Sequence, residues 1–246
     1  MNHSRKKQQN MKPLILASAS SHRRRQLQQL QVKFSHHKAA VDESLRPQES
    51  PQARAIRLAA AKAESVRNQF PEAVVIGSDQ VCSCDQRVYH KPGNRDNNIQ
   101  QLTEFSAREV FFYTAVCVID SAGERRQYVN NTQVQFRPLS ESEIIRYVDK
   151  EQAFDCAGGF KMEQLGLSLM VTVKSDDPSA LVGLPLIQLC GFLREFGFEL
   201  PYSYHLKRSL SINSRSASIM RSVFSGLLLL LAMLLLWLYA HDGYVK

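Results

Sequence analysis

Two short apolar runs, Leu14–Ala17 and Val74–Ile76, most constrain what this chain can fold into. A short apolar run bounded by small or polar residues is typical of a buried strand. After the first run, the small hydroxyl residues of Ser18–Ser21 lead into a helix predicted over His22–Gln31. Backbone N–H groups at such a helix start are free to bind a phosphate. This order of strand, small-residue loop and helix therefore predicts an anion site.

Strands and helices alternate along the rest of the chain up to residue 200. The apolar face of Pro51–Gln69 predicts a helix, and Glu109–Ile119 with Arg125–Arg137 predicts a hairpin. Further elements are expected as helices at Asn97–Phe105, Ser140–Val148 (with Ser140 and Glu143 as a capping box) and Pro185–Phe196, and as a strand at Leu167–Lys174. Because one strand pair is antiparallel among alternating helices, we expect an α/β fold with a mixed, twisted sheet flanked by helices.

The net charge of +8 is carried by the two ends of the chain. Residues 1–12 hold four basic residues and no acidic one, and residues 203–222 hold four more. Residues 13–202 contain 22 basic and 22 acidic residues, so this central part is neutral. A neutral central part argues against a broad nucleic-acid-binding surface, and we expect no nucleic-acid partner. The basic ends are either attracted to an anionic surface or simply solvated.

Residues 223–240 form an apolar segment without charge. As a helix the segment would be about 27 Å long, close to the roughly 30 Å thickness of a bilayer's hydrocarbon core. Trp237 and Tyr239 near its far end suit a membrane interface, and Arg215 and Arg221 before it place the rest of the chain on the cytoplasmic side. A buried core helix is the alternative, but such a helix should show a polar face, which this segment lacks.

The chain is therefore predicted to have four parts. We expect a disordered basic tail at 1–12, a folded domain at 13–200, a basic linker at 201–222 and a transmembrane tail anchor at 223–240. The five cysteines include no C-x-x-C pair and suit structural thiols in a reducing compartment. The N-terminus lacks an apolar run of signal-peptide length. These features predict a cytoplasmic domain.

Asp79 is the candidate catalytic residue. It follows the buried strand Val74–Ile76 beside Gly77, where α/β proteins place functional groups. A carboxylate at that place can activate water or hold a divalent metal. Capping of a turn or a helix is the alternative. Asp42-Glu43 offers a second carboxylate site, or only a loop.

Several cations are candidate phosphate contacts. Arg23, Arg24 and Arg25 lie at a helix start, where they oppose the helix dipole and an anionic ligand would relieve that cost. Arginine can also grip phosphate oxygens with paired hydrogen bonds. Lys62 on the helix with the apolar face and Lys91 in a loop before a proline are further candidates. For each of these residues a solvated surface position is the alternative.

A series of motifs resembles the Maf family of nucleoside triphosphate pyrophosphatases over roughly residues 12–200. In the family's order they are Leu14–Arg24, Val41–Glu43, Lys62–Glu64, Ile76–Gln80, Lys91–Pro92, Cys156–Gly158 and Val182–Leu186. The resemblance implies two lobes around a cleft, as in Maf and ITPase-like folds, and a homodimer. It also implies a divalent Mg²⁺ or Mn²⁺ ion and hydrolysis of a nucleoside triphosphate to its monophosphate and pyrophosphate.

The resemblance also implies roles for individual residues. Asp79 matches the proton acceptor. The residues that match those lining the phosphate and metal site are Ser18, Arg23, Glu43, Lys62 and Lys91, and Glu43 with Asp79 would hold the metal. Whether Asp79 acts as a base or chiefly as a metal ligand stays open.

The Ser-Asp-Gln form of the central motif resembles the subgroup that acts on 7-methyl-GTP, as do Phe112–Thr114 and Phe160–Glu163. His22, Gln80 and Glu163 match positions that tune base selectivity. Ser21 and His22 depart from the family, in which a proline and then an arginine or a large aromatic residue are common. A cationic 7-methylguanine suits an acidic partner and a flat stacking group. Hydrolysis of dTTP or UTP, and a nucleotide-binding septum regulator with little turnover, are the alternatives.

Overall fold

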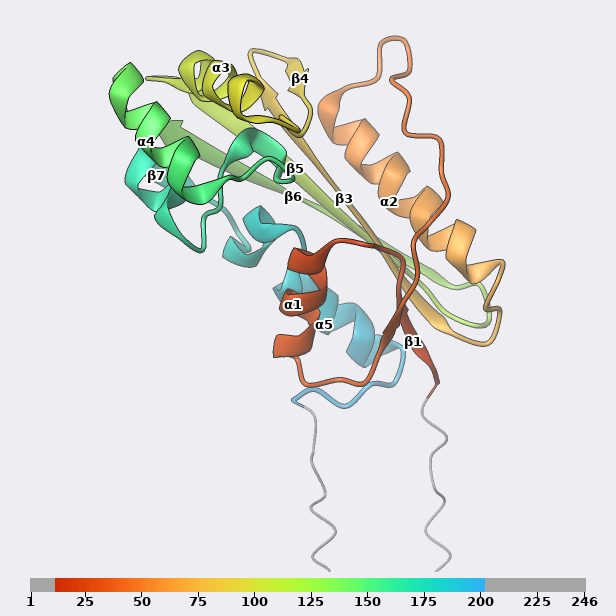
Figure 1. Ribbon diagram of the computed structural model, residues 1–246. Coiled ribbons are helices and arrows are strands. Elements are labelled where there is room, and N and C mark those ends of the chain that lie inside the picture. The colour runs from red at the N-terminus through yellow and green to blue at the C-terminus, as the bar shows by residue number, and fades with distance from the viewer. Residues whose placement is uncertain (1–11, 202–246) are drawn as a thin grey trace, which may run out of the picture. The chain divides into compact units, whose positions relative to one another are not determined.

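The structure is a computed structural model and describes residues 12–201 (Figure 1). In this range one mixed sheet contains β1 (Leu14–Leu16), β2 (Ser35–His36), β3 (Val74–Cys84), β4 (Arg87–Tyr89), β5 (Glu109–Ile119), β6 (Arg125–Phe136) and β7 (Met170–Lys174). The α-helices of the range are α1 (Ser21–Gln29), α2 (Pro51–Arg67), α3 (Arg95–Phe105), α4 (Glu141–Glu151) and α5 (Leu186–Glu195). The prediction of an α/β fold with a mixed sheet flanked by helices is therefore confirmed.

Strand β3 is the centre of the sheet, and its two edges differ. On one edge it pairs antiparallel with β5 from Val75 to Ser83. On the other edge it pairs first with the parallel strand β1, at Val74–Ile76, and then with the antiparallel strand β4, at Cys82–Cys84. The intervening stretch Gly77–Val81 pairs with no strand of residues 12–201 on this second edge. The sheet is thus open at this edge of β3, along the stretch that contains Asp79.

The two faces of β3 contact different helices. Val75 and Val81 on one face pack in a core with alanines of α2. On the opposite face, Val74 and Ile76 pack in a core with α1 and α5, whereas Cys82 and Cys84 pack in a core with α3 and α4. Figure 1 shows α2 along one side of the long strands, with the other two helix pairs at opposite ends. The result is two lobes joined by continuous strands.

Helix α2 approaches β3 very closely at Gly77. A Cβ atom at Gly77 would lie 2.2 Å from the carbonyl oxygen of Ala59 and 2.6 Å from the backbone nitrogen of Ala63. Only glycine in the strand, opposite alanines in the helix, allows this approach. The helix begins at Pro51, and the Ser50 hydroxyl accepts a hydrogen bond from the Ala53 N–H at its N-terminus.

Several predicted elements are confirmed, and two are corrected. The hairpin of β5 and β6 and the capping box of Ser140 and Glu143 are present. The second strand does not end at Ile76, because β3 stays paired with β5 through its polar residues and continues to Cys84. Asp79 therefore lies within a strand rather than after one. Residues 165–169 form a 3-10 helix, so β7 begins only at Met170.

The predictions for the two ends of the chain fall on residues 1–11 and 202–246, outside the described residues. These are the disordered basic tail, the basic linker and the transmembrane segment 223–240. Between residues 12 and 201, the structure holds no helix that combines the length and apolar character needed to cross a membrane.

The contact at Gly77 predicts the effect of one substitution. Gly77→Ala should lower the free energy of unfolding by about 1–3 kcal/mol, since the new methyl group overlaps helix backbone that cannot move aside. Gly191→Ala within α5 is the matched control, because its Cβ would meet nothing closer than 3.8 Å. That variant should be neutral or gain about 0.5–1 kcal/mol from the better helix propensity of alanine. Urea unfolding measures both, and equal stabilities would contradict the proposed close contact.

Candidate active site

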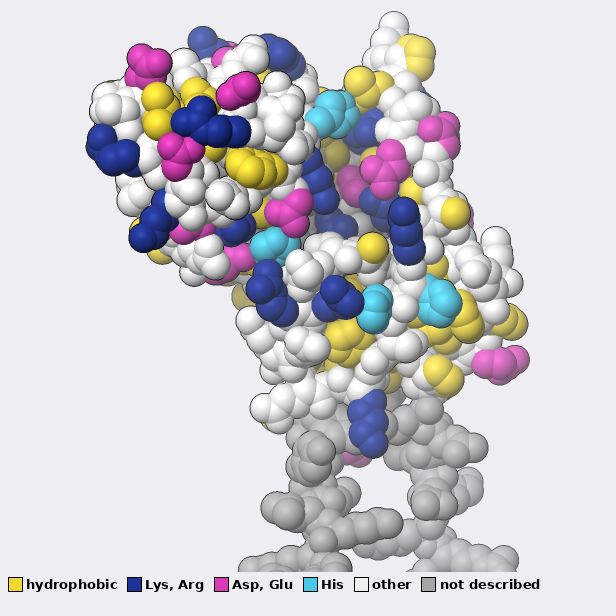
Figure 2. Space-filling model, viewed as in Figure 1, with side chains coloured by type: hydrophobic (Ala, Val, Ile, Leu, Met, Phe, Trp, Pro, Cys, Tyr) yellow, Lys and Arg dark blue, Asp and Glu magenta, His cyan; other side chains and the backbone are white. Residues whose placement is uncertain are grey.

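The open side of β3 forms the wall of a cleft of about 360 Å³, a volume within the range of small-molecule sites. Figure 2 shows this hollow beside α2, with cationic and anionic side chains gathered along it. Among its lining residues are Ser20, His22, Arg23, Glu43, Arg54, Leu58, Lys62, Asp79, Gln80, Tyr89, His90, Lys91, Asp155, Cys156, Phe160, Met162, Glu163 and Gly183. These residues lie far apart in the sequence, and the fold brings them together.

Asp79, Lys62 and Glu43 form one ionic cluster on the α2 side of the cleft. Asp79 lies two residues after Gly77, so its side chain leaves β3 on the face covered by α2. There Lys62 Nζ donates a hydrogen bond to Asp79 Oδ1 at 2.6 Å and lies 2.7 Å from Glu43 Oε1. The side chains of Lys62 and Asp79 are only 12% and 11% exposed. Two carboxylates therefore converge on one largely buried ammonium group.

The charge on Glu43 is favoured by its neighbours. Partial burial would raise the pKa of its carboxyl group, but the hydrogen bond from Lys62 and the charges of Arg54 and Arg23 lower the pKa below its ordinary value. Glu43 is thus an anion at neutral pH, in spite of its partial burial.

Arg54 is a cleft residue that the sequence analysis did not single out. It lies four and eight residues before Leu58 and Lys62 on α2, a spacing that places all three on one helix face. Its guanidinium donates to the backbone carbonyl oxygens of Glu43 and Ser44, so it holds the loop that carries Glu43. The sequence signal that could have identified Arg54 is a cation on the mostly apolar face of a predicted helix.

Only the first of the three consecutive arginines lines the cleft. Arg23 Nε donates to the carbonyl oxygen of Gly183 at 2.9 Å. Burial lowers its pKa, which the charges of Asp79 and Glu43 oppose, and an arginine stays charged at neutral pH under such a shift. Arg24 instead lies 3.0 Å from His36 Nε2, and Arg25 is exposed. Successive helix residues point about 100° apart, so the three could not share one ligand.

Gln80 projects from β3 on the face opposite to Asp79, because neighbouring strand residues alternate. Its Nε2 donates to Thr114 Oγ1 at 2.9 Å and to the carbonyl oxygens of Ala180 and Leu181 at 3.0 and 3.1 Å. The Ser78 hydroxyl on the same face donates to the Gly183 carbonyl oxygen at 2.9 Å. Together they attach the segment 178–183 to the strand, beside the cleft.

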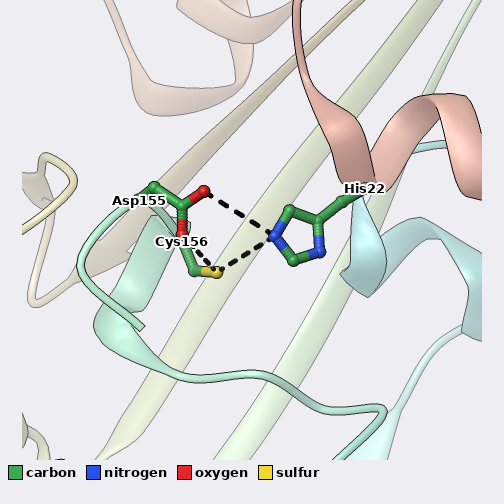
Figure 3. Close-up of side chains that lie close together, drawn as sticks. All are labelled: His22, Asp155 and Cys156. Carbon is green, nitrogen blue, oxygen red and sulfur yellow. Dashed lines mark hydrogen bonds and ion pairs between the residues drawn. The ribbon is translucent and has the colours of Figure 1, made fainter. Parts of the chain in front are cut away.

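A second polar group lies at the other end of the cleft. Glu163 Oε1 lies 3.2 Å from His22 Nδ1, and Asp155 and Cys156 lie beside the same imidazole ring (Figure 3). Phe160 and Met162 add apolar surface there. Burial and the neighbouring Asp155 raise the pKa of the Cys156 thiol to about 12, so without a ligand this thiol is protonated and is no nucleophile.

The cleft is therefore divided by charge. Its first half, around Asp79, holds the cations Arg23, Arg54 and Lys62 together with two carboxylates, and Lys91 also lines the cleft. Its second half holds acidic side chains and an imidazole with apolar neighbours. Such a cleft suits a ligand that is anionic at one end and flat or cationic at the other.

The structure brings most of the sequence-predicted site residues to this cleft. Those that line it are His22, Arg23, Glu43, Lys62, Asp79, Gln80, Lys91 and Glu163. Ser18 does not line it: Ser18 is buried, and its hydroxyl accepts a hydrogen bond from the N–H of Ser20, which lines the cleft instead. The roles assigned to these residues stay predictions.

Several known proteins are similar to most of this chain. The 7-methyl-GTP pyrophosphatase of Xanthomonas axonopodis pv. citri is 49% identical over 193 residues, which cover 78% of this chain and all of that protein. Proteins of the same name from Colwellia psychrerythraea and Idiomarina loihiensis are 43% and 45% identical, over 77% and 76% of this chain and 96% of each of theirs.

A solved structure and a family model are also similar to this chain. The Ham1 protein of Staphylococcus aureus superposes with a TM-score of 0.44 at 12% identity, over 75% of this chain and all of that one. The family model described as Maf-like protein matches residues 13–196. This match spans most of the chain and, with relatives at up to 50% identity, it shows that the chain belongs to the Maf family.

Proposed function

We propose that this protein is a nucleoside triphosphate pyrophosphatase that hydrolyses 7-methyl-GTP to its monophosphate and pyrophosphate. The division of the cleft by charge carries the proposal: 7-methyl-GTP has an anionic triphosphate at one end and a cationic base at the other, and the cleft offers a matching half to each. The names of the relatives at 43–50% identity support the same substrate.

The first half of the cleft binds the triphosphate. Arg23, Lys62 and Lys91 neutralise phosphate oxygens, and these charges stabilise the transition state most where water is excluded. Arg54 acts indirectly, because its guanidinium is occupied by the backbone of the Glu43 loop. The hydrolysis takes place between the α- and β-phosphates, next to Asp79.

Asp79 orients the attacking water and accepts its proton. Its Oδ1 accepts the hydrogen bond from Lys62, whereas its Oδ2 receives none from residues 12–201. This second oxygen is therefore the one available to a water molecule. The ammonium of Lys62 holds the carboxylate in place, so that the base is fixed before the substrate binds.

The same half of the cleft fits a divalent cation such as Mg²⁺ or Mn²⁺. Glu43 and Asp79 lie close together, because one carboxylate oxygen of each contacts Lys62 Nζ, and Glu43 is ionised at neutral pH. Mg²⁺ is commonly held by one or two carboxylates together with substrate phosphates and water. Glu43 and Asp79 would hold the ion, which would supply charge neutralisation at the phosphates.

The second half of the cleft binds the base. Glu163 supplies a negative charge for the cationic 7-methylguanine ring, and the flat ring of His22 stacks on it. Gln80 acts through position: its three hydrogen bonds fix the segment 178–182, which contributes Leu181 and Val182 to the cleft. Base selectivity thus depends on the charge of Glu163 and on the fixed position of the segment 178–182.

Replacement of the proposed base tests the reaction. Asp79→Asn keeps the size of the side chain and removes the proton acceptor, so pyrophosphate release from 7-methyl-GTP should fall by about 10²–10⁴-fold. Asp42→Asn is the matched control, because among residues 12–201 the Asp42 carboxylate accepts hydrogen bonds from Ser44 alone and does not line the cleft. A coupled pyrophosphate assay measures both variants. If Asp79→Asn and Asp42→Asn both kept the wild-type activity, the assignment of Asp79 as the base would be overturned.

A triphosphate panel with Glu163→Gln tests the substrate. The wild type should favour 7-methyl-GTP over GTP, dTTP and UTP, and Glu163→Gln should lower the kcat/KM preference for 7-methyl-GTP over GTP by about 10-fold through loss of one charge contact. Glu72→Gln, an exposed residue outside the cleft, is the control. An unchanged preference would refute the role of Glu163. A wild-type preference for dTTP or UTP would refute the substrate.

We further propose that the protein acts as a homodimer in the cytoplasm. Exposed apolar side chains lie on the outer strand β7 and on the 3-10 helix before it, and they suit a contact with a second copy: Leu165, Leu167, Val171 and Val173. All five cysteines of the chain are free thiols, which suits a reducing compartment.

The dimer contact can be tested with one charge. Val171→Lys should convert a dimer to a monomer, because a buried ammonium at the contact has no partner. Ile187→Lys is the matched control, since Ile187 is equally exposed but lies on α5. Light scattering coupled to gel filtration gives both masses. A monomeric wild type, or a dimer that survives Val171→Lys, would contradict this surface.

A further inference from the structure

Three potential metal ligands meet at the base-binding end of the cleft (Figure 3). Cys156 Sγ lies 3.7 Å from His22 Nε2 and 3.5 Å from Asp155 Oδ1, and His22 Nε2 lies 3.9 Å from Asp155 Oδ2. The histidine comes from α1 and the other two residues from the loop before the 3-10 helix Ala157–Gly159. Residues 134 positions apart are thus brought together.

These separations match those of a tetrahedral site. Ligands at about 2.0–2.3 Å from a shared zinc ion lie about 3.3–3.6 Å from one another. The distances of 3.7 Å from Cys156 Sγ to His22 Nε2 and of 3.5 Å from Sγ to Asp155 Oδ1 come within 0.2 Å of that range. The 3.9 Å distance from His22 Nε2 runs to the other carboxylate oxygen, Oδ2, so coordination by one oxygen requires a rotation of the Asp155 side chain, which is 68% exposed.

His22 is also oriented as a metal-bound histidine would be. Its Nε2 faces the thiol and Asp155, and its Nδ1 lies 3.2 Å from Glu163 Oε1. A carboxylate at the second ring nitrogen fixes the ring and its tautomer in metal sites. Arg25 also lies 3.2 Å from Nδ1, but Nδ1 cannot donate to Glu163 and accept from Arg25 at once. A metal at Nε2 selects donation to Glu163.

We propose that His22, Asp155 and Cys156 bind a Zn²⁺ ion that excludes the nucleotide base from the cleft. One nitrogen, one oxygen and one sulfur ligand suit Zn²⁺ and leave its fourth position open. Binding forms a zinc–thiolate bond and releases the thiol proton to solvent. The site differs in ligand type from the all-oxygen pair of Glu43 and Asp79, so the two ions are distinguished by chemistry.

The position of this site predicts how zinc acts on the enzyme. None of its ligands is Asp79, Lys62 or Glu43, so the reacting groups stay in place. The ion would add positive charge beside Glu163, where the cationic base is proposed to bind, and Cys156 and Glu163 line the same cleft as His22. Zinc should therefore compete with the nucleotide. This competition rests on the proposed function, whereas the binding of zinc does not rest on it.

Binding is tested on the full chain with Co²⁺ as a spectroscopic substitute for Zn²⁺. The wild type should bind one Co²⁺ per chain with a thiolate-to-cobalt charge-transfer band in the near ultraviolet, which Zn²⁺ removes and excess Mg²⁺ does not. Cys156→Ser should lose the band. Cys190→Ser should keep it, because Cys190 is a partly exposed thiol on α5 outside the cluster. Absence of the band in the wild type, or its survival in Cys156→Ser, would overturn the proposal.

Two further variants separate ligation from folding. His22→Gln and Asp155→Asn should each weaken Zn²⁺ binding at least about 10-fold in competition with a chromophoric chelator. Circular dichroism melting identifies any variant that fails to fold. The variants that do fold then decide whether the replaced residue binds zinc. Unchanged affinity in a folded variant would remove that residue from the site.

Kinetics test the exclusion of the base. Added Zn²⁺ should raise the apparent KM for 7-methyl-GTP with kcat unchanged, and Cys156→Ser should be less sensitive than Cys190→Ser. A fall in kcat at constant KM would refute competition. An inactive wild type that still shows the cobalt band would refute the proposed function and leave the zinc site standing.

Discussion

The close contact between α2 and β3 at Gly77 is the constraint on which the cleft depends. Without a Cβ atom at this position, the backbone of Ala59 and Ala63 reaches the strand. Lys62 lies between these two alanines on α2, and Asp79 is two strand residues, about 6–7 Å, beyond Gly77. Lys62 therefore meets Asp79, and Arg54, two turns earlier, holds the loop of Glu43.

Each polar side chain in the middle of β3 has at least one hydrogen-bond partner. Ser78, Asp79 and Gln80 lie inside a strand of a closely packed sheet, where an unpaired polar group costs about 1–3 kcal/mol. The carbonyl oxygens of residues 180, 181 and 183 accept from one face, and Lys62 donates to the other. The same contacts that stabilise the strand also place its side chains for binding, so stability and recognition share residues.

The sequence predicted the elements well where periodicity was strong, and less well where polar residues interrupted it. The hairpin and the capping box of Ser140 and Glu143 follow from local patterns and were confirmed. The extension of β3 to Cys84 was not predicted, because its polar residues resemble a loop until their distant partners are known. Arg54 was missed for a similar reason. The pairing of His22 with Glu163, 141 residues apart, needed the fold itself; motif order could group these residues but not place their atoms.

Asp79 and Gln80 are neighbours in sequence, yet they leave the strand on opposite faces. In the proposed mechanism, one peptide bond therefore separates the residue that accepts the proton from a residue that positions the loop at the base. With this arrangement, substitutions on the Gln80 face can change which base is accepted while the residues at the phosphates stay the same. A single residue inserted before Asp79 would instead disrupt the phosphate chemistry. It would exchange the two faces of the strand, so that the carboxylate would point away from Lys62.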